Sequence, residues 1–414
     1  MDSVTKNNTP AVRFEGFDGE WGAVELQQIA DIVGGGTPST SVTSFWDGDI
    51  DWYSPNEIGE TAIAKPSNKR ITRAGLANSS ARLLPAHRTV LFTSRASIGH
   101  AAILDHPATT NQGFQSFVLN KGVDTHFFYA LTSKITEIAE QLATGSTFLE
   151  VSNKTVREIE VHVPATEEQR AIGELFSDLD ALIEQHRAKH ENLQQTKTAL
   201  LQRMFPKDGA DEPELRLGGF SGRWQRVSFG DTVESFKYGV NAAATDYDGV
   251  TKYLRITDLD ESSGQFGTGL ATSPRAEEET IRDFLLGEGD MVFARTGATV
   301  GRSYLFRKSV GRTVWAGFLI RARFKRNTDP QFVAVYAQTD SYWTYVQLTS
   351  QRSGQPGLNS AEYAAMPITT PPTLEEQRAI GEVFSNLDAL ITAEHRYITQ
   401  LTQAKTALLQ RMFV

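Results

Sequence analysis

Two long stretches of the chain carry apolar residues at alternating spacings of three and four, the pattern of a helix with one apolar stripe. They cover residues 165–205 and 373–413. Each predicts a helix of ~39 residues, or ~58 Å at about 1.5 Å per residue. A stripe on so long a helix needs a partner. The predicted helix-pairing residues are Ile172, Phe176, Leu179, Ile183, Leu193, Leu200, Ile380, Phe384, Leu387, Ile391, Leu401 and Leu408.

The two stretches are copies of one another. Glu167–Glu174 (EEQRAIGE) recurs as Glu375–Glu382, and Lys197–Phe205 (KTALLQRMF) recurs as Lys405–Phe413. Because each copy ends a domain and has its twin at the end of the next, the duplication predicts that the two helices pair with each other as a coiled coil. The alternative, in which each helix folds back on its own domain, is less favoured because such a helix would overshoot a domain of ~150 residues.

A threonine marks the start of each helix. Thr166, two residues after Pro164, is predicted to cap the first helix, and the helix dipole favours the acidic residues of its first turn. In the second copy Thr373 lies one position earlier relative to the repeat. We therefore expect the cap of the second helix to be shifted.

The regions before the helices, residues 12–164 and 215–372, share landmarks in the same order but have otherwise diverged. One architecture is therefore used twice, with different surfaces. The charged segment 206–214 is predicted to be a linker. The shared landmarks are Gly16–Trp21 with Gly219–Trp224, Trp52–Ile58 with Tyr253–Leu259, Ala96–Gly99 with Ala298–Gly301, and Gly113–Phe114 with Gly317–Phe318.

Short alternating runs in the diverged regions predict strands, as at 89–92 and 318–324, and helical patterns lie at 125–141 and 331–348. In 318–324 the residues Ile320, Ala322 and Phe324 are expected on one face of the strand, with Arg321 and Arg323 on the other. The predicted fold class is mixed α/β: two globular domains separated by two long helices, in a pseudo-two-fold tandem repeat.

The net charge of −9 conceals two acid-free basic stretches. Residues 61–104 contain seven Lys or Arg residues and no Asp or Glu, and residues 291–326 contain nine and none. Their similar positions in the two halves favour a shared role over two incidental solvated surfaces. Clustered cations matter more than net charge for binding nucleic acid.

The sequence offers little catalytic chemistry. It has no cysteine, no phosphate-loop lysine motif, no HExxH and no amino-methyltransferase motif, so we expect no catalytic residue and no metal site. Gly34–Pro38 (GGGTP) fits a tight turn at least as well as a phosphate cradle. His186 and His190 have the spacing of two metal ligands but lack a third. No apolar run is long enough to span a membrane, and a cytoplasmic location is expected.

The two helix blocks, together with Gly35–Ser39 (GGTPS) and the paired Ala-x-x-Gly turns, resemble the DNA-specificity subunit of type I restriction–modification systems. The resemblance runs from Val12 to Phe413. It implies two target-recognition domains, residues 12–164 and 215–372, each of which reads one half of a split DNA site. It also implies that the paired helices run antiparallel and act as a spacer.

The resemblance further implies partners that carry the chemistry. Two modification subunits would bind S-adenosylmethionine and methylate adenine, and restriction subunits would use ATP and Mg to translocate and cleave DNA. This chain itself would be non-catalytic and would hold no cofactor. The residues expected to contact double-stranded DNA are Lys69, Arg70, Arg73, Asn78, Arg82, Arg95, Arg255, Arg275, Arg295, Arg302, Arg321 and Arg323.

Because the two domains are unlike in sequence, the expected site is asymmetric and bipartite. Basic side chains would give affinity through phosphates, and diverged loops would select the bases. The competing hypothesis is a coiled-coil adaptor that joins proteins and does not recognise DNA directly. A fused restriction–methylation enzyme is disfavoured by the missing methyltransferase motifs.

Overall fold

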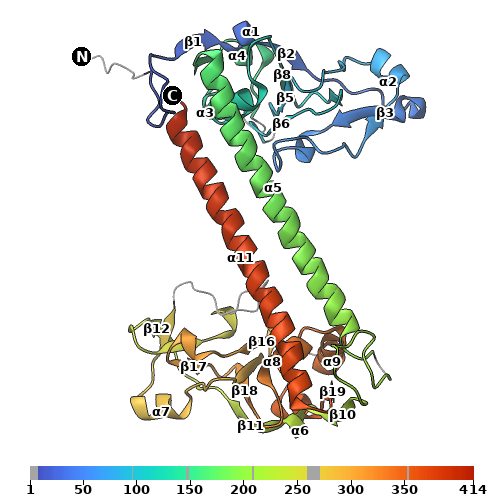
Figure 1. Cartoon of the computed structure of the whole chain (residues 1–414), viewed down its shortest axis with the longest axis vertical. Coiled ribbons are helices and arrows are strands. Elements are labelled where there is room, and N and C mark those ends of the chain that lie inside the picture. Colours follow the sequence, from blue (N-terminus) through green and yellow to red (C-terminus); the bar gives the residue numbers. More distant parts are fainter. Residues whose placement is uncertain (1–7, 96, 146–148, 208, 259–270, 352–353) are drawn as a thin grey trace. The chain divides into compact units, whose positions relative to one another are not determined.

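The computed structural model describes residues 8–95, 97–145, 149–207, 209–258, 271–351 and 354–414 (Figure 1). They form two compact units, which are described separately. The first unit combines Met1–Lys189 with Glu394–Val414, and the second is His190–Ala393. Each unit holds one domain of helices and strands, which confirms the mixed α/β class, and parts of both long helices. No helix in the described ranges has the length and apolar content that crossing a membrane requires.

The two long helices have the lengths that the sequence predicts. Helix α5 spans Thr166–Arg203, and helix α11 spans Leu374–Met412. Thr373 caps α11, because its hydroxyl oxygen accepts the backbone N–H of Glu376 at 3.2 Å. The shifted cap expected for the second copy is therefore present.

The predicted cap of α5 is wrong. Thr166 lies in the first turn of the helix, and its hydroxyl donates to the Gly122 carbonyl at 3.3 Å. The repeat places Ala165 where α11 has Thr373, and alanine has no side-chain oxygen to accept a helix N–H. The Ala165 carbonyl still accepts the first helical bond, from Gln169 at 3.0 Å.

Within the first unit the two helices run antiparallel, as predicted. Asp180 of α5 pairs with Lys405 of α11 at 2.5 Å, and about 1.7 turns later His186 pairs with Glu394 at 2.6 Å. Advancing along α5 thus means moving back along α11. The His186 ring also packs on Tyr397 at 4.5 Å, so this histidine serves the helix contact.

The helices have the same relative direction in the second unit. Lys197 of α5 pairs with Asp388 of α11 at 2.6 Å, and Phe205, just after α5, packs on the Phe384 ring at 6.4 Å. In the repeat Lys197 is the copy of Lys405, and Asp388 is the copy of the aspartate that pairs with it. Each unit therefore holds one copy of the same lysine–aspartate pair.

The predicted helix-pairing residues differ in burial according to their place along the helices. Those toward the start and the end of each helix lie in or against a domain core, whereas those toward the middle belong to neither core; the latter are Ile183, Leu193, Ile391 and Leu401. Both alternatives for the helices thus apply to different parts of them. The buried residues are Ile172, Phe176, Ile183, Ile380 and Phe384, and the half-buried ones are Leu179, Leu193, Leu200, Leu387, Ile391, Leu401 and Leu408.

The domain of the first unit is built on a four-stranded antiparallel sheet with the order β2-β8-β5-β6. Helix α3 covers one face, where Phe92 and Phe117 join its buried residues, and Leu91 points into a second cluster with Tyr53 on the other face. The strands are β1 (Gly22–Glu25), β2 (Ala30–Gly34), β3 (Trp46–Tyr53), β4 (Arg70–Ile71), β5 (Thr89–Phe92), β6 (Ala101–Ile103), β7 (Thr109–Thr110), β8 (Gln115–Leu119) and β9 (Glu160–Val163). The shorter helices are α1 (Leu26–Ile29), α2 (Arg73–Ala77), α3 (Thr125–Leu142) and α4 (Asn153–Arg157).

The second unit repeats this sheet with the order β11-β18-β15-β16. Its predicted helix at 331–348 is divided into α8 and α9, which together take the place of α3. The strands are β10 (Gln225–Ser228), β11 (Val233–Tyr238), β12 (Ala244–Asp246), β13 (Lys252–Leu254), β14 (Thr272–Pro274), β15 (Met291–Ala294), β16 (Ser303–Leu305), β17 (Thr313–Trp315), β18 (Leu319–Phe324) and β19 (Pro367–Thr370). The helices are α6 (Phe229–Thr232), α7 (Glu278–Asp283), α8 (Pro330–Tyr336), α9 (Asp340–Ser350) and α10 (Ser360–Ala365).

The same aromatic junction ties a helix end to each domain. In the first unit Phe413, just after α11, packs on Trp21 at 6.0 Å and on Phe176 at 5.9 Å. In the second unit Phe205 packs on Trp224 at 6.1 Å as well as on Phe384. Each domain core is therefore completed by the end of the helix that belongs to the other half of the sequence.

A buried ion pair repeats beside each junction. Arg13 holds Glu168 with two hydrogen bonds of 2.7 Å, and Arg216 holds Glu376 with two of 2.8 Å. The carboxylates are only 2% and 1% exposed. Since a buried carboxylate without a partner is strongly unfavourable, each arginine fixes the entry segment of a domain against the start of a long helix.

Candidate nucleic-acid interface

In the first domain, four of the residues predicted to contact DNA surround β4 and α2. Lys69 lies 6.0 Å from the Trp52 ring, and Arg70 donates from Nε to Asp51 at 2.9 Å. Arg73 begins α2 and Asn78 follows it, and both are exposed. The structure thus brings three cations and an amide together on one small projection, where their heads remain accessible to a phosphate backbone.

Asp51 is buried beneath this projection and orients it. It accepts the backbone N–H of Ser67 at 2.9 Å and lies 3.0 Å from Nε2 of His106. Burial acts to lower the pKa of His106, but contacts with Asp105 and Asp51 outweigh it, so the pKa is raised above the ordinary value. The acidic Asp47–Asp51 segment therefore includes a structural carboxylate.

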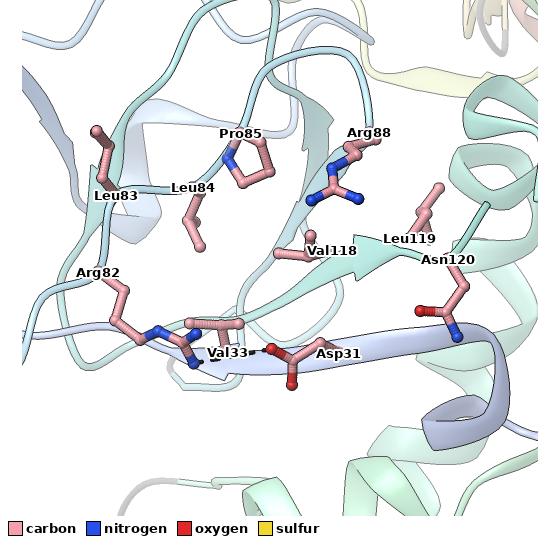
Figure 2. Close-up of a pocket in the computed structure, with 10 residues that line it drawn as sticks. All are labelled: Asp31, Val33, Arg82, Leu83, Leu84, Pro85, Arg88, Val118, Leu119 and Asn120. Atoms are coloured by element: carbon pink, nitrogen blue, oxygen red, sulfur yellow. Dashed lines mark ion pairs between the residues drawn. The ribbon is translucent and has the colours of Figure 1, made fainter.

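A hollow of about 340 Å³ opens beside β2 and β8 of the same domain (Figure 2). Arg82 points toward Asp31 across it, at 3.8 Å, and Arg88 lines another part of the wall. The other lining residues are aliphatic, apart from Asn120. Its lining therefore offers two cations, one of which already faces a carboxylate.

Arg95 follows β5 and pairs with Glu150 at 2.7 Å while both side chains remain exposed. Ala96, the first residue of a predicted landmark turn, lies outside the described residues. Gly99 at the end of that turn adopts a φ of +94°, and a Cβ on it would lie 2.2 Å from Thr136 of α3. Gly301 of the matching turn has a φ of +87°. The landmark glycines thus permit a tight turn against a covering helix.

The glycine-rich Gly34–Pro38 segment is explained by close backbone packing. A Cβ on Gly35 would lie 1.9 Å from the Asn111 carbonyl oxygen, and one on Gly239 would lie 2.1 Å from the Ala316 carbonyl oxygen. The glycines let two strand ends approach each other in each domain. Nothing in this arrangement requires a phosphate.

The second domain holds its predicted DNA contacts more tightly. Arg255 binds Asp258 with hydrogen bonds of 3.0 and 2.7 Å, and Arg323 binds Asp290 with bonds of 2.8 and 2.7 Å. Arg275 is exposed after β14, and Arg302 is half-buried before β16. The Tyr253–Leu259 landmark is described only as far as residue 258, because Leu259 lies outside the described residues.

Arg321 does not suit the role predicted for it. Its side chain is 7% exposed, lies 5.5 Å from the Trp315 ring and donates to Ser235 at 2.8 Å. The alternation expected in 318–324 is present, but the second face is covered here by Trp315. Arg321 therefore supports the sheet, and we remove it from the candidate DNA contacts.

Arg295, which follows β15, belongs to a group that the sequence did not reveal. Its guanidinium lies 5.0 Å from the centre of the Tyr238 ring, and its backbone N–H donates to the Phe318 carbonyl at 3.1 Å. The Tyr238 hydroxyl donates to Ser360 at 3.2 Å. Burial acts to raise the pKa of Tyr238, but the Ser360 contacts and the Arg295 cation outweigh it and lower the pKa.

The landmark that pairs Gly113–Phe114 with Gly317–Phe318 is displaced by one residue in the structure. Gln115 faces Gly34 in one sheet, and Ile320 faces Tyr238 in the other. Phe114, which is fully buried, therefore corresponds to Leu319, and Gly113 corresponds to Phe318, which is 61% exposed. The matching letters had concealed this exposed aromatic side chain.

The described residues contain no group of three or more His, Asp or Glu side chains that could hold a metal ion. His186 instead faces Glu394 in the helix pair. Both domains carry exposed cations, and the second also carries one exposed aromatic side chain, Phe318, at its strand ends.

A family model described as "Type I restriction modification DNA specificity domain" matches residues 18–195 and again residues 223–403. The chain belongs to this family. The two matches contain the two domains and most of both long helices, so the internal repeat is a repeat of the family's unit.

Relatives in this family include specificity subunits of known restriction enzymes. That of the type I restriction enzyme MjaIX from Methanocaldococcus jannaschii is 34% identical over 190 residues, which are 45% of this chain and 44% of that protein. That of EcoR124I/EcoR124II from Escherichia coli is 30% identical over 173 residues, 39% of this chain and 42% of that protein. The matched sequence thus spans less than half the length of these relatives.

Solved structures extend the likeness to the whole fold. The crystal structure of a type I restriction–modification S subunit from M. genitalium has a TM-score of 0.67 at 16% identity and covers 98% of this chain and 99% of that one. A chain from work on complex assembly and conformational transition of the type I R-M system has a TM-score of 0.51 at 17% identity, with 95% and 97% covered. At these identities the likeness establishes the shared fold.

Proposed function

We propose that this chain is the DNA-specificity subunit of a type I restriction–modification complex and reads an asymmetric bipartite DNA site, one half-site with each domain. The observation that carries the proposal is the contrast within the repeat. Two domains with the same order of strands in their four-stranded sheets present different polar and aromatic groups at equivalent strand ends, while the segments near the start and the end of the long helices are nearly identical in sequence. Different base sequences require different readers on a common support.

The same proposal assigns the chemistry to partners. Two modification subunits would bind S-adenosylmethionine and methylate adenine, and restriction subunits would use ATP and Mg to translocate and cleave DNA. The chain itself would perform no reaction and would work in the cytoplasm, where it has access to DNA. The repeated helix surfaces support two equivalent docking places for the modification subunits.

The long helices would set the distance between the half-sites. A helix rises about 1.5 Å per residue and DNA about 3.4 Å per base pair, so adding one helical turn changes the spacing by roughly one to two base pairs. Lengthening α5 and α11 together by one turn is therefore expected to widen the unread gap and to leave both half-sites unchanged. A change in either half-site sequence would contradict this role.

Exchange of one domain tests the whole proposal. Residues 215–372 are replaced by the corresponding domain of another family member, and methylation is mapped genome-wide in cells that carry the matching modification subunit. We expect one half-site to change while the other stays the same. A continuous palindromic target, or simultaneous change of both halves, would overturn the bipartite reading.

The adaptor hypothesis predicts a different result. A coiled-coil adaptor would assemble with its partners but would give no sequence preference, and its basic side chains would be incidental. Binding of the assembled complex to a long mixed-sequence duplex is therefore measured at several salt concentrations. Our proposal expects affinity to fall steeply with salt, since several phosphate contacts release counterions, and to be higher for the mapped site.

A further inference from the structure

The strand ends of the two domains can be compared position by position. The strand registers make Gly34 equivalent to Tyr238, as shown above. A backbone bond from Ser94 to the Gly113 carbonyl, at 2.8 Å, is matched by the bond from Arg295 to the Phe318 carbonyl, at 3.1 Å. Ser94 is therefore equivalent to Arg295, and Gly113 to Phe318.

A third backbone bond supports the same alignment. The carbonyl of Ser94 accepts the N–H of Val151 at 3.1 Å, and the carbonyl of Arg295 accepts the N–H of Leu358 at 2.8 Å. Val151 and Leu358 are both fully buried core residues. Strand register and two sets of hydrogen bonds thus agree on the equivalence.

At these three positions the first domain has Gly, Ser and Gly, whereas the second has Tyr238, Arg295 and Phe318. We call the latter three the aromatic–arginine cluster. Side chains alternate along a strand, so the cluster lies on the sheet face of Phe236, Phe293 and Ile320, at the end where the strands stop. Two of the three positions in the first domain have no side chain at all.

The cluster is organised around Arg295. No carboxylate among the described residues pairs with this arginine, in contrast to Arg255, Arg321 and Arg323, which each face an aspartate. Its guanidinium is held over the Tyr238 ring, and the tyrosine is held by Ser360. Arg295 is therefore a half-buried, oriented cation that faces no carboxylate among the described residues, and its buried Nε has no hydrogen-bond partner there. It lies beside an exposed aromatic side chain, within an acid-free stretch of sequence.

We infer that the aromatic–arginine cluster is the base-reading element of the second domain, in which Arg295 contacts a guanine and Phe318 packs on the methyl group of a neighbouring thymine in double-stranded DNA. The inference rests on the proposed function, and it names the residues of the second domain that read DNA and the bases that they contact. A guanidinium matches the O6 and N7 acceptors of guanine, and an apolar side chain matches the C5 methyl of thymine. Tyr238 is a positioning residue, since it holds the guanidinium in place.

The corresponding surface of the first domain has to read DNA differently. At the same places the first domain has Gly34, Ser94 and Gly113, of which Ser94 and Gly113 are buried, so no large side chain projects there, and the nearby exposed cation is Arg95. The two domains therefore present unlike surfaces to the groove. That difference gives a direct comparison for the test.

The test uses the full chain assembled with its modification subunits and a duplex that carries the mapped site. In the half-site that changes on exchange of residues 215–372, each thymine is replaced by deoxyuridine, which lacks the methyl group, and each guanine by 7-deazaguanine, which lacks N7. We expect one deoxyuridine to weaken binding about fourfold, the value of one buried methyl group. One neighbouring 7-deazaguanine is expected to weaken it by at least about fivefold.

The variants assign these effects to residues. Phe318→Ala is expected to abolish sensitivity to that deoxyuridine alone, and Arg295→Ala sensitivity to that 7-deazaguanine alone. Tyr238→Leu is expected to reduce the 7-deazaguanine effect and to leave the deoxyuridine effect, as befits a positioning residue. Leu348→Ala and Arg282→Ala, which remove an exposed apolar and an exposed cationic side chain elsewhere in the second unit, are the matched controls and should retain both sensitivities.

Several results would overturn the inference while the proposed function stands. One is specific binding whose base-analogue profile is the same in wild type, Phe318→Ala and Arg295→Ala. Another is an Arg295→Ala variant that loses affinity equally for all sequences and has a salt dependence shallower by about one ion, which marks a phosphate contact. If the complex prefers no site at all, the proposed function fails first.

Discussion

The two units have the same buried ion pair at the start of a long helix, but they carry different side chains at the ends of their sheet strands. Both hold a doubly hydrogen-bonded Arg–Glu pair, Arg13 with Glu168 and Arg216 with Glu376, at nearly the same distances. Above them, three equivalent positions carry Gly, Ser and Gly in one unit and Tyr, Arg and Phe in the other. Removing one partner of these buried ion pairs would leave a charge buried without its partner, whereas strand ends can change side chains without altering the fold.

The largest difference in stability between the two units is expected when the aromatic residue that completes one core is removed. Phe413→Ala is expected to destabilise the first unit by about 3–5 kcal/mol, because it leaves a cavity among Trp21, Phe127 and Phe176. Hydrogen exchange followed by mass spectrometry reports each unit separately. Protection should fall in the first unit, although the substitution is almost at the other end of the sequence.

The matched variant is Phe205→Ala, which should lower protection in the second unit by a similar amount. Its ring packs on Trp224, Phe332 and Phe384. If Phe413→Ala instead loosened the second unit, or both units equally, the assignment of each helix end to its domain would be wrong.

The buried ion pairs are expected to give the next largest effect. Arg13→Ala leaves the Glu168 carboxylate buried without its partner, at a cost of about 3 kcal/mol, and Arg216→Ala does the same for Glu376. The pKa of each arginine is raised, chiefly by its hydrogen bonds to the glutamate. Arg223→Ala, whose pair with Asp211 is exposed, serves as control and should change the unfolding free energy by less than about 1 kcal/mol.

Chemical denaturation monitored separately in each unit measures these differences. Equal effects in the two units would show that the ion pair is a true repeat of function as well as of sequence. An Arg13→Ala variant no less stable than Arg223→Ala would contradict the structural role assigned to the pair.

The two lysine–aspartate pairs between the long helices should contribute different amounts to the free energy of unfolding, and this difference is smaller than the effects above. Lys405 and Asp180 are 17% and 16% exposed, and the lysine lies 5.4 Å from the Tyr129 ring. Asp388, the partner of Lys197, is 36% exposed. Lys405→Met is therefore expected to cost about 1 kcal/mol more than Lys197→Met, through the cation–π contact and the drier ion pair. Thermal unfolding of both variants checks the order, and the reverse order would contradict it.

Much of the architecture could be predicted because it follows from patterns within short or repeated segments of the sequence. Apolar spacing located both long helices, the duplication predicted that they pair, and the family resemblance implied their antiparallel direction. The cap of α5 could not be assigned from the sequence alone. Whether Ala165 or Thr166 occupies the cap position depends on the contact of Thr166 with Gly122, which is far away in the sequence. Likewise the burial of Arg321 depends on Trp315, which no spacing rule connects to it.

The candidate interface was only partly predictable for a related reason. Counting cations found Arg295, since charge clusters can be read directly from sequence. Phe318 was missed because its alignment follows from strand register, and register is set by hydrogen bonds between distant segments. The shared Gly-Phe dipeptide aligned Phe318 with Phe114, a core residue. The alignment therefore did not show that Phe318 is the most exposed large aromatic side chain at the strand ends of the second domain.

The smallest expected effect concerns pH. The raised pKa of His106 means that its protonated form is stabilised in the folded state, so this contribution is present below the unfolded pKa of about 6.5 and is lost as the pH rises through the higher folded pKa. His106→Asn should therefore lower the melting temperature of the first unit more at pH 5.5 than at pH 8.5. The side chain is 36% exposed, which keeps the effect small.

His126→Asn is the matched control for loss of an imidazole, since His126 has no carboxylate partner among the described residues. The second unit contains a single histidine, His190, so it has no counterpart of His106, and the His106→Asn effect is expected in the first unit. A larger loss at pH 8.5 than at pH 5.5 for His106→Asn would contradict the direction of the shift.

The division of the helices between the units has a consequence for how the protein is made. Residues 190–393 form the second unit from one continuous stretch, but the first unit needs residues 394–414 to close its core. On the ribosome the N-terminal domain therefore emerges first and is completed last, with Trp21 and Phe176 uncovered while the whole second unit is synthesised. Contacts of such long sequence separation form slowly, and exposed apolar surface invites aggregation or chaperone binding in the interval.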